Sequence, residues 1–127
     1  MTLVPPGKLR VMLCDDSSTV RSALARVLES DPGIAVVSRV GDGAQALAAL
    51  DAAPQAERAQ VVLLDLEMPV MDGMTALPLI LRREPRPIVI VASALTQKGA
   101  SATMDALRAG ASDYIPKPGA AGGGLND

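Results

Sequence analysis

Residues 9–33 read LRVMLCDDSSTVRSALARVLESDPG, and this stretch contains the repeating unit of the fold. It opens with a near-continuous apolar run at residues 9–14, which suits a strand that is covered on both faces. Apolar side chains then recur at helical spacing over residues 20–28, with Ser17 or Ser18 as the N-cap. The stretch therefore predicts a buried strand that leads directly into an amphipathic helix.

The same alternation continues along the chain. Short apolar runs that suit strands lie between stretches of helical periodicity. Strands that alternate with helices of about ten residues favour an α/β fold with a parallel sheet and right-handed crossovers. The remaining predicted strands are residues 34–40, 61–64, 88–92 and 111–115, and the remaining predicted helices are residues 44–53, 74–83 and 102–109.

Composition excludes several classes of function. The 127 residues fit one domain, and the net charge of −2 gives no drive toward nucleic acid or an anionic membrane. The chain has no histidine, which excludes a Ser-His-Asp triad, a histidine base and histidine-bound zinc. The single Cys14 excludes an internal disulfide. No apolar run approaches the roughly 20 residues that span a bilayer, so we expect a soluble cytoplasmic protein.

Polar side chains follow four of the predicted strands at the point where each strand ends. Asp15 and Asp16 come after the first strand, and Asp65 comes after the third. Ser93 follows the fourth strand, and Lys117 follows the fifth. In an open parallel sheet the carboxyl ends of the strands share one edge, where ligands bind. We therefore expect these side chains to converge on one site.

This set of side chains indicates phosphoryl chemistry. Clustered carboxylates repel one another unless a cation neutralises them, and oxygen ligands without histidine or thiolate favour Mg²⁺. A carboxylate such as Asp65, held in that setting, can act as a nucleophile toward phosphorus. The metal and the Lys117 ammonium would neutralise charge on the transferring phosphoryl oxygens. Because the chain lacks histidine, a phosphohistidine donor would have to come from another protein.

Four separated motifs occur in a fixed order along the chain. They are MLCDDS at residues 12–17, LLDLEMPVMDGM at 63–74, IVIVASALT at 88–96 and AGASDYIPKP at 109–118. In this order and spacing they resemble the receiver domains of two-component response regulators. Within that family they are most similar to the N-terminal receiver of the chemotaxis protein-glutamate methylesterases.

The resemblance implies a flavodoxin-like, doubly wound sheet of five parallel strands in the order 2-1-3-4-5. Residues 8–118 would form the receiver domain, and residues 1–7 an N-terminal extension. Residues 119–127 read GAAGGGLND, which suits a flexible tail or the start of a linker and cannot supply the family's fifth helix. A missing fifth helix would expose aliphatic surface, so we expect a homodimer or marginal stability.

The resemblance also implies a role for each acidic residue. Asp65 matches the phosphoacceptor, and Asp16 matches the direct Mg²⁺ ligand. Asp15 matches the acidic neighbour that holds metal-bound water. The backbone carbonyl of Glu67 matches the remaining protein ligand. Mg²⁺ is therefore the expected cofactor.

Three further residues match the family's switch. Lys117 matches the lysine that contacts the phosphate, and the Lys117–Pro118 peptide bond is expected to be cis. Ser93 matches the hydroxyl residue that turns toward the phosphoryl group. Tyr114 matches the aromatic residue that swings inward with it. These matches predict that phosphorylation changes the face made by the fourth helix and the fifth strand.

The predicted function is that of a phosphorylation-dependent switch in chemotaxis signalling. A phosphorylated histidine kinase would dock near the first helix, and a partner protein or attached output domain would bind the fourth helix and fifth strand. No direct contact with nucleic acid or membrane is expected. The chain itself would not be an enzyme beyond accepting its own phosphoryl group. The catalytic domain of a methylesterase parent would lie elsewhere, since the chain has no G-x-S-x-G motif.

Three alternatives remain open from the sequence. A stand-alone receiver fits almost as well as the regulatory part of a methylesterase. A small phosphatase of the haloacid-dehalogenase type also uses an aspartate nucleophile and Mg²⁺, and Asp65-Leu66-Glu67 superficially imitates its carboxylate pair. A pseudo-receiver that only binds partners is the third alternative, and the intact acidic set with Lys117 argues against it.

Overall fold

The structure is a computed structural model that describes residues 7–118, in which five strands alternate with four helices. Within these residues no helix is both long enough and apolar enough to cross a membrane. The elements are β1 (Leu9–Cys14), α1 (Ser18–Glu29), β2 (Ile34–Val40), α2 (Gly43–Ala52), β3 (Val61–Asp65), α3 (Gly73–Leu81), β4 (Ile88–Ser93), α4 (Gln97–Arg108) and β5 (Asp113–Pro116).

The strands form one parallel sheet in the order β2-β1-β3-β4-β5. This confirms the predicted doubly wound, flavodoxin-like sheet. The chain reverses its direction of winding between β1 and β3, which are neighbours in the sheet. In such folds the crevice at this switch point, beyond the carboxyl ends of the strands, is where ligands bind.

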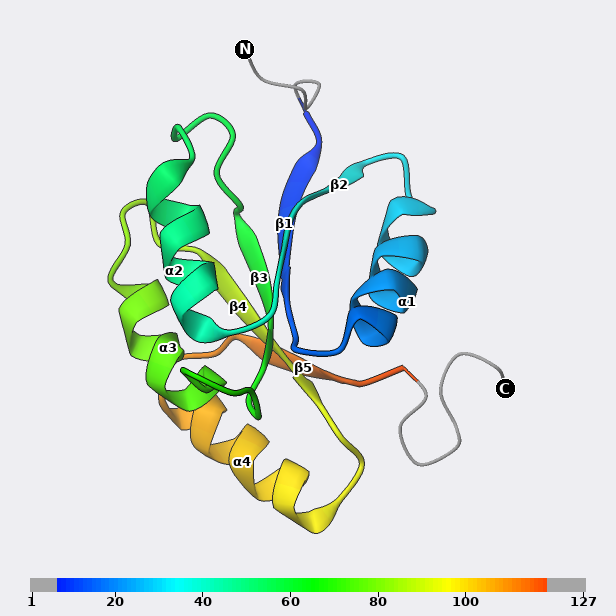
Figure 1. Ribbon diagram of the computed structural model, residues 1–127, viewed down its shortest axis with the longest axis vertical. Helices are drawn as coiled ribbons and strands as arrows, with labels where there is room; N and C mark the ends of the chain where they lie inside the picture. The colour runs from blue at the N-terminus through cyan, green and yellow to red at the C-terminus, as the bar shows by residue number, and fades with distance from the viewer. Residues whose placement is uncertain (1–6, 119–127) are drawn as a thin grey trace.

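The helices cover the two faces of the sheet unequally. Figure 1 shows α1 on one face and α2, α3 and α4 on the other. Successive strand residues point to opposite faces of the sheet, where the buried side chains form two hydrophobic clusters. Met12 packs into the larger cluster with Leu64 and Leu77. Leu13 packs into the smaller cluster with Leu24 of α1. Both clusters consist of aliphatic and sulphur-containing side chains, as the composition requires.

The fourth helix begins at Gln97, earlier than the predicted start at residue 102. Thr96 is its N-cap, and the Thr96 side chain accepts a hydrogen bond from the backbone N–H of Gly99 at 2.9 Å. The first turn is polar and contains glycine, so apolar periodicity could not reveal it. A Cβ at Gly99 would lie 2.3 Å from the carbonyl oxygen of Ala94, so close packing favours glycine here.

The third helix begins directly beside the end of β3. Its N-cap is Asp72, whose side chain accepts a hydrogen bond from the backbone N–H of Thr75 at 2.8 Å. A Cβ at Gly73 would lie 2.3 Å from the backbone oxygen of Asp65, so glycine allows the helix to start against that residue. Pro78 lies inside the helix and removes one N–H from its hydrogen-bond ladder.

Two expectations concern the end of the chain. Among residues 7–118 the structure has a single cis peptide bond, Glu84–Pro85, so the predicted cis bond at Lys117–Pro118 is wrong. The trans form is intrinsically favoured for X–Pro bonds by about 0.5–1 kcal/mol. The expected tail and missing fifth helix fall on residues 119–127, which lie outside the described residues.

Candidate functional site

Three aspartates meet at the carboxyl end of the sheet. Asp15 follows β1 and is 2% exposed, and Asp65 ends β3 and is 3% exposed. Asp16 is the exposed member of the group. One carboxylate oxygen from each of the three lies within 4.8 Å of the others. The convergence expected from the strand ends is therefore present for all three acids.

Lys117 completes this cluster from the other side of β3. Its ammonium lies 3.0 Å from Asp65 Oδ1 and 3.2 Å from Asp15 Oδ2. The backbone N–H of Lys117 donates to the carbonyl oxygen of Ser93 at 2.9 Å, which fixes the residue beside the end of β4. One ammonium therefore bridges two buried carboxylates, and the convergence expected from the strand ends extends to Lys117.

The two oxygens of Asp65 have different surroundings. Oδ1 receives the Lys117 ammonium and also accepts the backbone N–H of Glu67 at 3.1 Å. Oδ2 is buried and has no hydrogen-bond donor among the described residues. Asp15 Oδ2 is likewise buried, and Lys117 is its ion-pair partner. A buried carboxylate oxygen without a donor is costly, so it is available to a cation or an electrophile.

Burial shifts the proton affinities of this cluster. It raises the pKa of Asp65 above its ordinary value, and this outweighs the Glu67 N–H and Lys117, which lower it. The negative charge of Asp15 raises the Asp65 pKa further. Burial lowers the pKa of Lys117, but the Asp65 and Asp15 carboxylates outweigh burial and raise that pKa above its usual value. Lys117 is therefore a cation throughout the neutral range.

The cluster has the chemistry of a hard-cation site. Its side-chain donors are all carboxylate oxygens, which Mg²⁺ prefers. Asp65 Oδ2 is buried without a donor from the described part of the chain, and a single ammonium is shared between Asp65 Oδ1 and Asp15 Oδ2. The acidic residues that are present therefore fit Mg²⁺. The backbone N–H of Glu67 is held by Asp65, whereas the use of the Glu67 carbonyl as a ligand stays a prediction.

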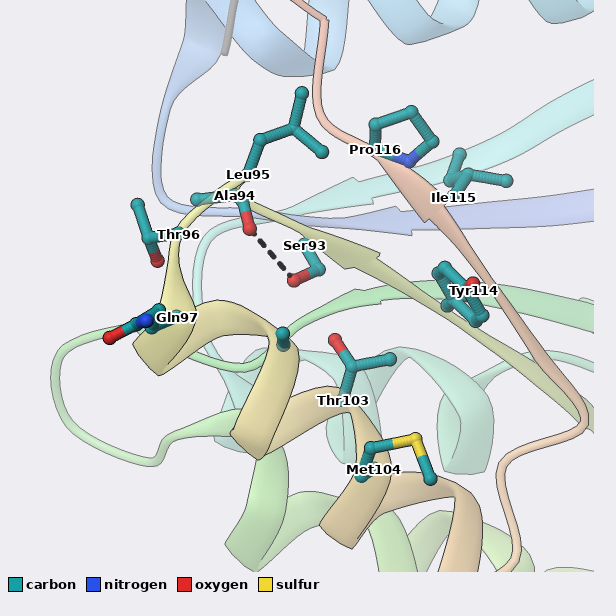
Figure 2. A pocket seen from close by; sticks show the side chains of 11 residues that line it. Ser93, Ala94, Leu95, Thr96, Gln97, Thr103, Met104, Tyr114, Ile115 and Pro116 are labelled. Atoms are coloured by element: carbon teal, nitrogen blue, oxygen red, sulfur yellow. Dashed lines mark hydrogen bonds between the residues drawn. The ribbon is translucent and has the colours of Figure 1, made fainter. Parts of the chain in front are cut away.

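Ser93 lies at the wall between two cavities. It lines a small cavity of about 40 Å³ together with Asp65 and Lys117. It also lines a cavity of about 670 Å³ between α4 and β5, which Figure 2 shows together with Tyr114. The Ser93 hydroxyl donates to the carbonyl oxygens of Ala94 and Gly99, at 3.2 and 3.1 Å. Ser93 is therefore next to the acidic site, and its hydroxyl is bonded away from Asp65.

Tyr114 is 54% exposed and lies on β5 at the edge of the larger cavity. The cavity is lined mainly by apolar side chains, including Leu95 and Met104. It lies beside the aromatic ring and provides space for the side chain to turn inward. The switch roles of Ser93 and Tyr114 are compatible with this geometry and stay predictions.

Sequence reasoning missed the surroundings of three residues around the site. The Arg21 guanidinium of α1 donates to the backbone carbonyl of Asp15. The Lys98 ammonium lies 3.6 Å from a carboxylate oxygen of Glu67, a residue that lines the smaller cavity. Both contacts depend on tertiary placement, which the sequence pattern does not carry.

Cys14 is the third residue whose surroundings the sequence did not indicate. Its thiol donates to the carbonyl oxygen of Asp42 at 3.4 Å and lies 3.6 Å from the sulphur of Met68. Burial raises the pKa of this thiol to about 12, and the neighbouring carboxylates of Asp42, Asp65 and Asp15 add to the shift. Cys14 is therefore a neutral packing residue, as its place at the end of an apolar strand predicts.

Comparison with known proteins now decides the family. The model of the response regulator receiver domain matches residues 11–123. The chain belongs to the response regulator receiver domain family. It is 52% identical over 110 residues to protein-glutamate methylesterase/protein-glutamine glutaminase 1 of Paramagnetospirillum magneticum, covering 87% of this chain and 28% of that protein. It is 51% identical over 110 residues to the corresponding protein of Azospirillum brasilense, covering 87% and 27%.

Solved receiver structures agree with this assignment. The response regulator domain of Thermotoga maritima CheB superposes with a TM-score of 0.74 at 38% identity, covering 89% of this chain and 81% of that chain. A chain of the CheX–CheY–BeF₃–Mg²⁺ complex of Borrelia burgdorferi gives a TM-score of 0.74 at 30% identity, covering 87% of this chain and 78% of that chain. The chain is therefore a receiver domain homologous to the regulatory domain of CheB. It spans little more than a quarter of the curated methylesterases.

Proposed function

We propose that this receiver accepts a phosphoryl group on Asp65 from a phosphohistidine of a histidine kinase. The observation that carries the proposal is the position of Asp65, buried at the strand end between a second acid and the Lys117 ammonium. A buried aspartate without a charged partner would destabilise the folded state. An aspartate held by a lysine at one oxygen, with its other oxygen free of donors, is arranged for reaction.

The chemical step forms one bond and breaks one. A carboxylate oxygen of Asp65 attacks phosphorus in line with the leaving nitrogen, and an O–P bond forms while the donor's P–N bond breaks. The electron pair of the P–N bond stays on the imidazole nitrogen of the donor. Asp65 becomes an acyl phosphate. The Glu67 N–H and Lys117 hold the carboxylate in place during attack, because both bind the same oxygen, Oδ1.

Charge on the phosphoryl oxygens needs compensation as the transfer proceeds. Lys117 keeps its proton and supplies one positive charge beside Asp65. Asp15, Asp16, Asp65 and the Glu67 carbonyl are the ligands we propose for Mg²⁺. When bound, the metal supplies the remaining neutralisation of phosphoryl charge. Asp15 contributes a buried carboxylate and positions the lysine through the ion pair of its Oδ2 with the Lys117 ammonium.

The proposed output follows from the position of Ser93. Its hydroxyl would leave its two carbonyl acceptors and donate to a phosphoryl oxygen on Asp65, across the small cavity that both residues line. Tyr114 would then turn into the larger cavity (Figure 2). The exposed surface of α4 and β5 would change, and a partner that prefers the changed surface would also favour phosphorylation.

The similarity to methylesterases supports a regulatory role in chemotaxis. We propose that the domain controls an attached or separate output partner, as the regulatory domain of a protein-glutamate methylesterase. Esterase chemistry would belong to another domain of that parent, so this chain would not itself turn over substrate. We propose that the receiver acts in the cytoplasm. Family membership offers no support to the small-phosphatase alternative.

Beryllofluoride with Mg²⁺ tests the proposed function, because it mimics a phosphoryl group bound to a carboxylate. Thermal unfolding would be measured for the wild type, Asp65→Asn and the control Asp105→Asn, whose carboxylate is exposed on α4. We expect a Mg²⁺-dependent rise in Tm for the wild type and the control, and none for Asp65→Asn. An equal rise in Asp65→Asn would refute the role of Asp65. No rise in any folded variant would favour a receiver that only binds partners.

A further inference from the structure

The carbonyl oxygen of Gly99 receives more donors than it has lone pairs. The hydroxyl of Ser93 lies 3.1 Å from this oxygen, and the hydroxyl of Thr103 lies 2.8 Å from it. The α-helical ladder of α4 directs the backbone N–H of Thr103 to the same oxygen. A backbone carbonyl has two lone pairs, so three donors compete for it.

Ser93 is the weaker of the two hydroxyl donors at this oxygen. Its distance to Gly99 is longer than that of Thr103, and its single proton is shared with a second acceptor, the Ala94 carbonyl at 3.2 Å. The packing is nevertheless close, because a Cβ on Gly99 would lie 3.0 Å from Ser93 Oγ. Ser93 is thus held against the first turn of α4 by a bond that is easily given up.

Thr103 keeps the Gly99 carbonyl satisfied whether or not Ser93 stays. Its side chain is buried, at 4% exposure, and Figure 2 shows it on the wall of the cavity beside α4. When Ser93 leaves, the hydroxyl and the backbone N–H of Thr103 still donate to this oxygen, so both of its lone pairs remain satisfied. The hydroxyl of Thr103 has no other role among the contacts of the described residues.

We propose that Thr103 is a positioning residue for Ser93. By occupying the Gly99 carbonyl, its hydroxyl weakens the bond that holds Ser93 to α4 and frees the Ser93 hydroxyl to turn toward Asp65. The consequence for signalling rests on the proposed function. The competition at Gly99 is a property of the unphosphorylated protein and can be measured without any phosphodonor.

The first experiment measures the side-chain rotamers of Ser93 by NMR coupling constants, in the absence of Mg²⁺ and phosphate. Thr103→Val removes the hydroxyl and keeps the shape, so Ser93 should shift toward the rotamer bonded to Gly99 by about two- to tenfold, the size expected for one hydrogen bond. Thr103→Ser restores a hydroxyl and should match the wild type. Unchanged Ser93 populations in Thr103→Val would overturn the proposal, as would equal shifts in Thr103→Ser and Thr103→Val.

The second experiment adds Mg²⁺ and beryllofluoride and follows the emission of Tyr114, the only aromatic residue in the chain. Thr103→Val should need about two- to tenfold more beryllofluoride for half of the response, with unchanged affinity for Mg²⁺ alone. Thr75→Val is the matched control, since Thr75 is exposed on α3, and it should titrate like the wild type. If Thr103→Val titrates like the wild type, the positioning role is wrong. If no variant binds beryllofluoride, the proposed function fails, and the rotamer measurement alone decides the role of Thr103.

Discussion

The Lys117 ammonium lies 3.0 Å from Asp65 Oδ1 and 3.2 Å from Asp15 Oδ2, so one cation neutralises part of the charge on two buried acids. Lys117 has a side chain that is 20% exposed, whereas the two carboxylates are almost fully buried. Breaking a buried ion pair by removing one partner leaves an uncompensated charge. The unphosphorylated protein therefore depends on this lysine, or on a metal ion that takes over its charge.

Lys117→Met should lower the free energy of unfolding by roughly 3 kcal/mol without Mg²⁺, because two buried carboxylates lose their cation. Saturating Mg²⁺ should recover more stability in this variant than in the wild type, since the metal supplies the missing charge. Urea unfolding with EDTA and with Mg²⁺ measures both effects. Lys98→Met, which removes an exposed lysine, is the control. A Lys117→Met protein as stable as the control in EDTA would contradict the role of Lys117.

The contribution of Asp65 to stability should depend on pH in the opposite sense to that of an ordinary ion-paired carboxylate. Burial raises its folded pKa above the ordinary 3.8, so ionisation of Asp65 costs stability. In EDTA the wild type should lose stability relative to Asp65→Asn as the pH rises from 3.8 through the folded pKa, and the difference should then level off. Urea unfolding of both proteins at a series of pH values, from 3.8 upward until the difference is constant, measures this difference in stability. A difference that grows in favour of the wild type with rising pH would show that the ion pair outweighs burial.

The stabilising contribution of Lys117 should remain constant over that acidic range. Its folded pKa is raised, so its contribution is complete below the ordinary value of 10.5 and is lost only as the pH rises through the folded pKa. The pH dependence of the difference between the wild type and Asp65→Asn at acidic pH is therefore assigned to Asp65.

Mg²⁺ should stabilise the protein through the acids, with Asp16 as the most accessible one. At a concentration of 100 times its Kd, a ligand that binds only the folded state adds about 2.7 kcal/mol. Asp16→Asn should lose most of this gain. Its stability without Mg²⁺ should change by less than about 0.5 kcal/mol, because Asp16 is exposed. Asp105→Asn, a change at an exposed acid on α4, should keep the full gain. Equal Mg²⁺ responses in the two variants would exclude Asp16 as a ligand.

Ser93→Ala should separate phosphoryl uptake from its structural consequence. Asp65 and Lys117 remain in place, so beryllofluoride should still bind with Mg²⁺. The change in Tyr114 emission should fall at least about threefold, because the variant lacks the Ser93 hydroxyl that would link the phosphoryl group on Asp65 to the movement of Tyr114. Ser112→Ala, a change at an exposed serine before β5, is the control. A full Tyr114 response in Ser93→Ala would remove Ser93 from the switch.

Much of this arrangement follows from the sequence because strand ends in a parallel sheet share one edge. Asp15, Asp65 and Lys117 each follow a short apolar run, and pattern alone therefore placed them together. The strand order followed from the family resemblance and is confirmed. These features depend on periodicity and chain order, which the sequence carries directly.

The remaining features depend on packing between distant segments. The early start of α4 was missed because its first turn, with Gly99, carries no apolar period. The Gly99 carbonyl has three donors: the Ser93 hydroxyl at the end of β4, and the hydroxyl and backbone N–H of Thr103 on α4. The sequence could not indicate this arrangement, because it depends on how α4 packs against β4. The cis Lys117–Pro118 bond was expected by analogy, and the structure has the intrinsically favoured isomer instead.

Phosphorylation of Asp65 is the central claim, and an intact-mass measurement tests it most directly. The protein would be incubated with acetyl phosphate, with Mg²⁺ or with EDTA, and its intact mass would be recorded. A second portion would be reduced with borohydride, which converts an acyl phosphate to an alcohol with release of phosphate and so marks the residue that carried it. We expect the wild type to gain one phosphoryl mass only with Mg²⁺, with the marked residue at position 65, and Asp65→Asn to gain none. A folded wild-type protein that gains no phosphoryl group, or that gains it at another residue, would contradict the account.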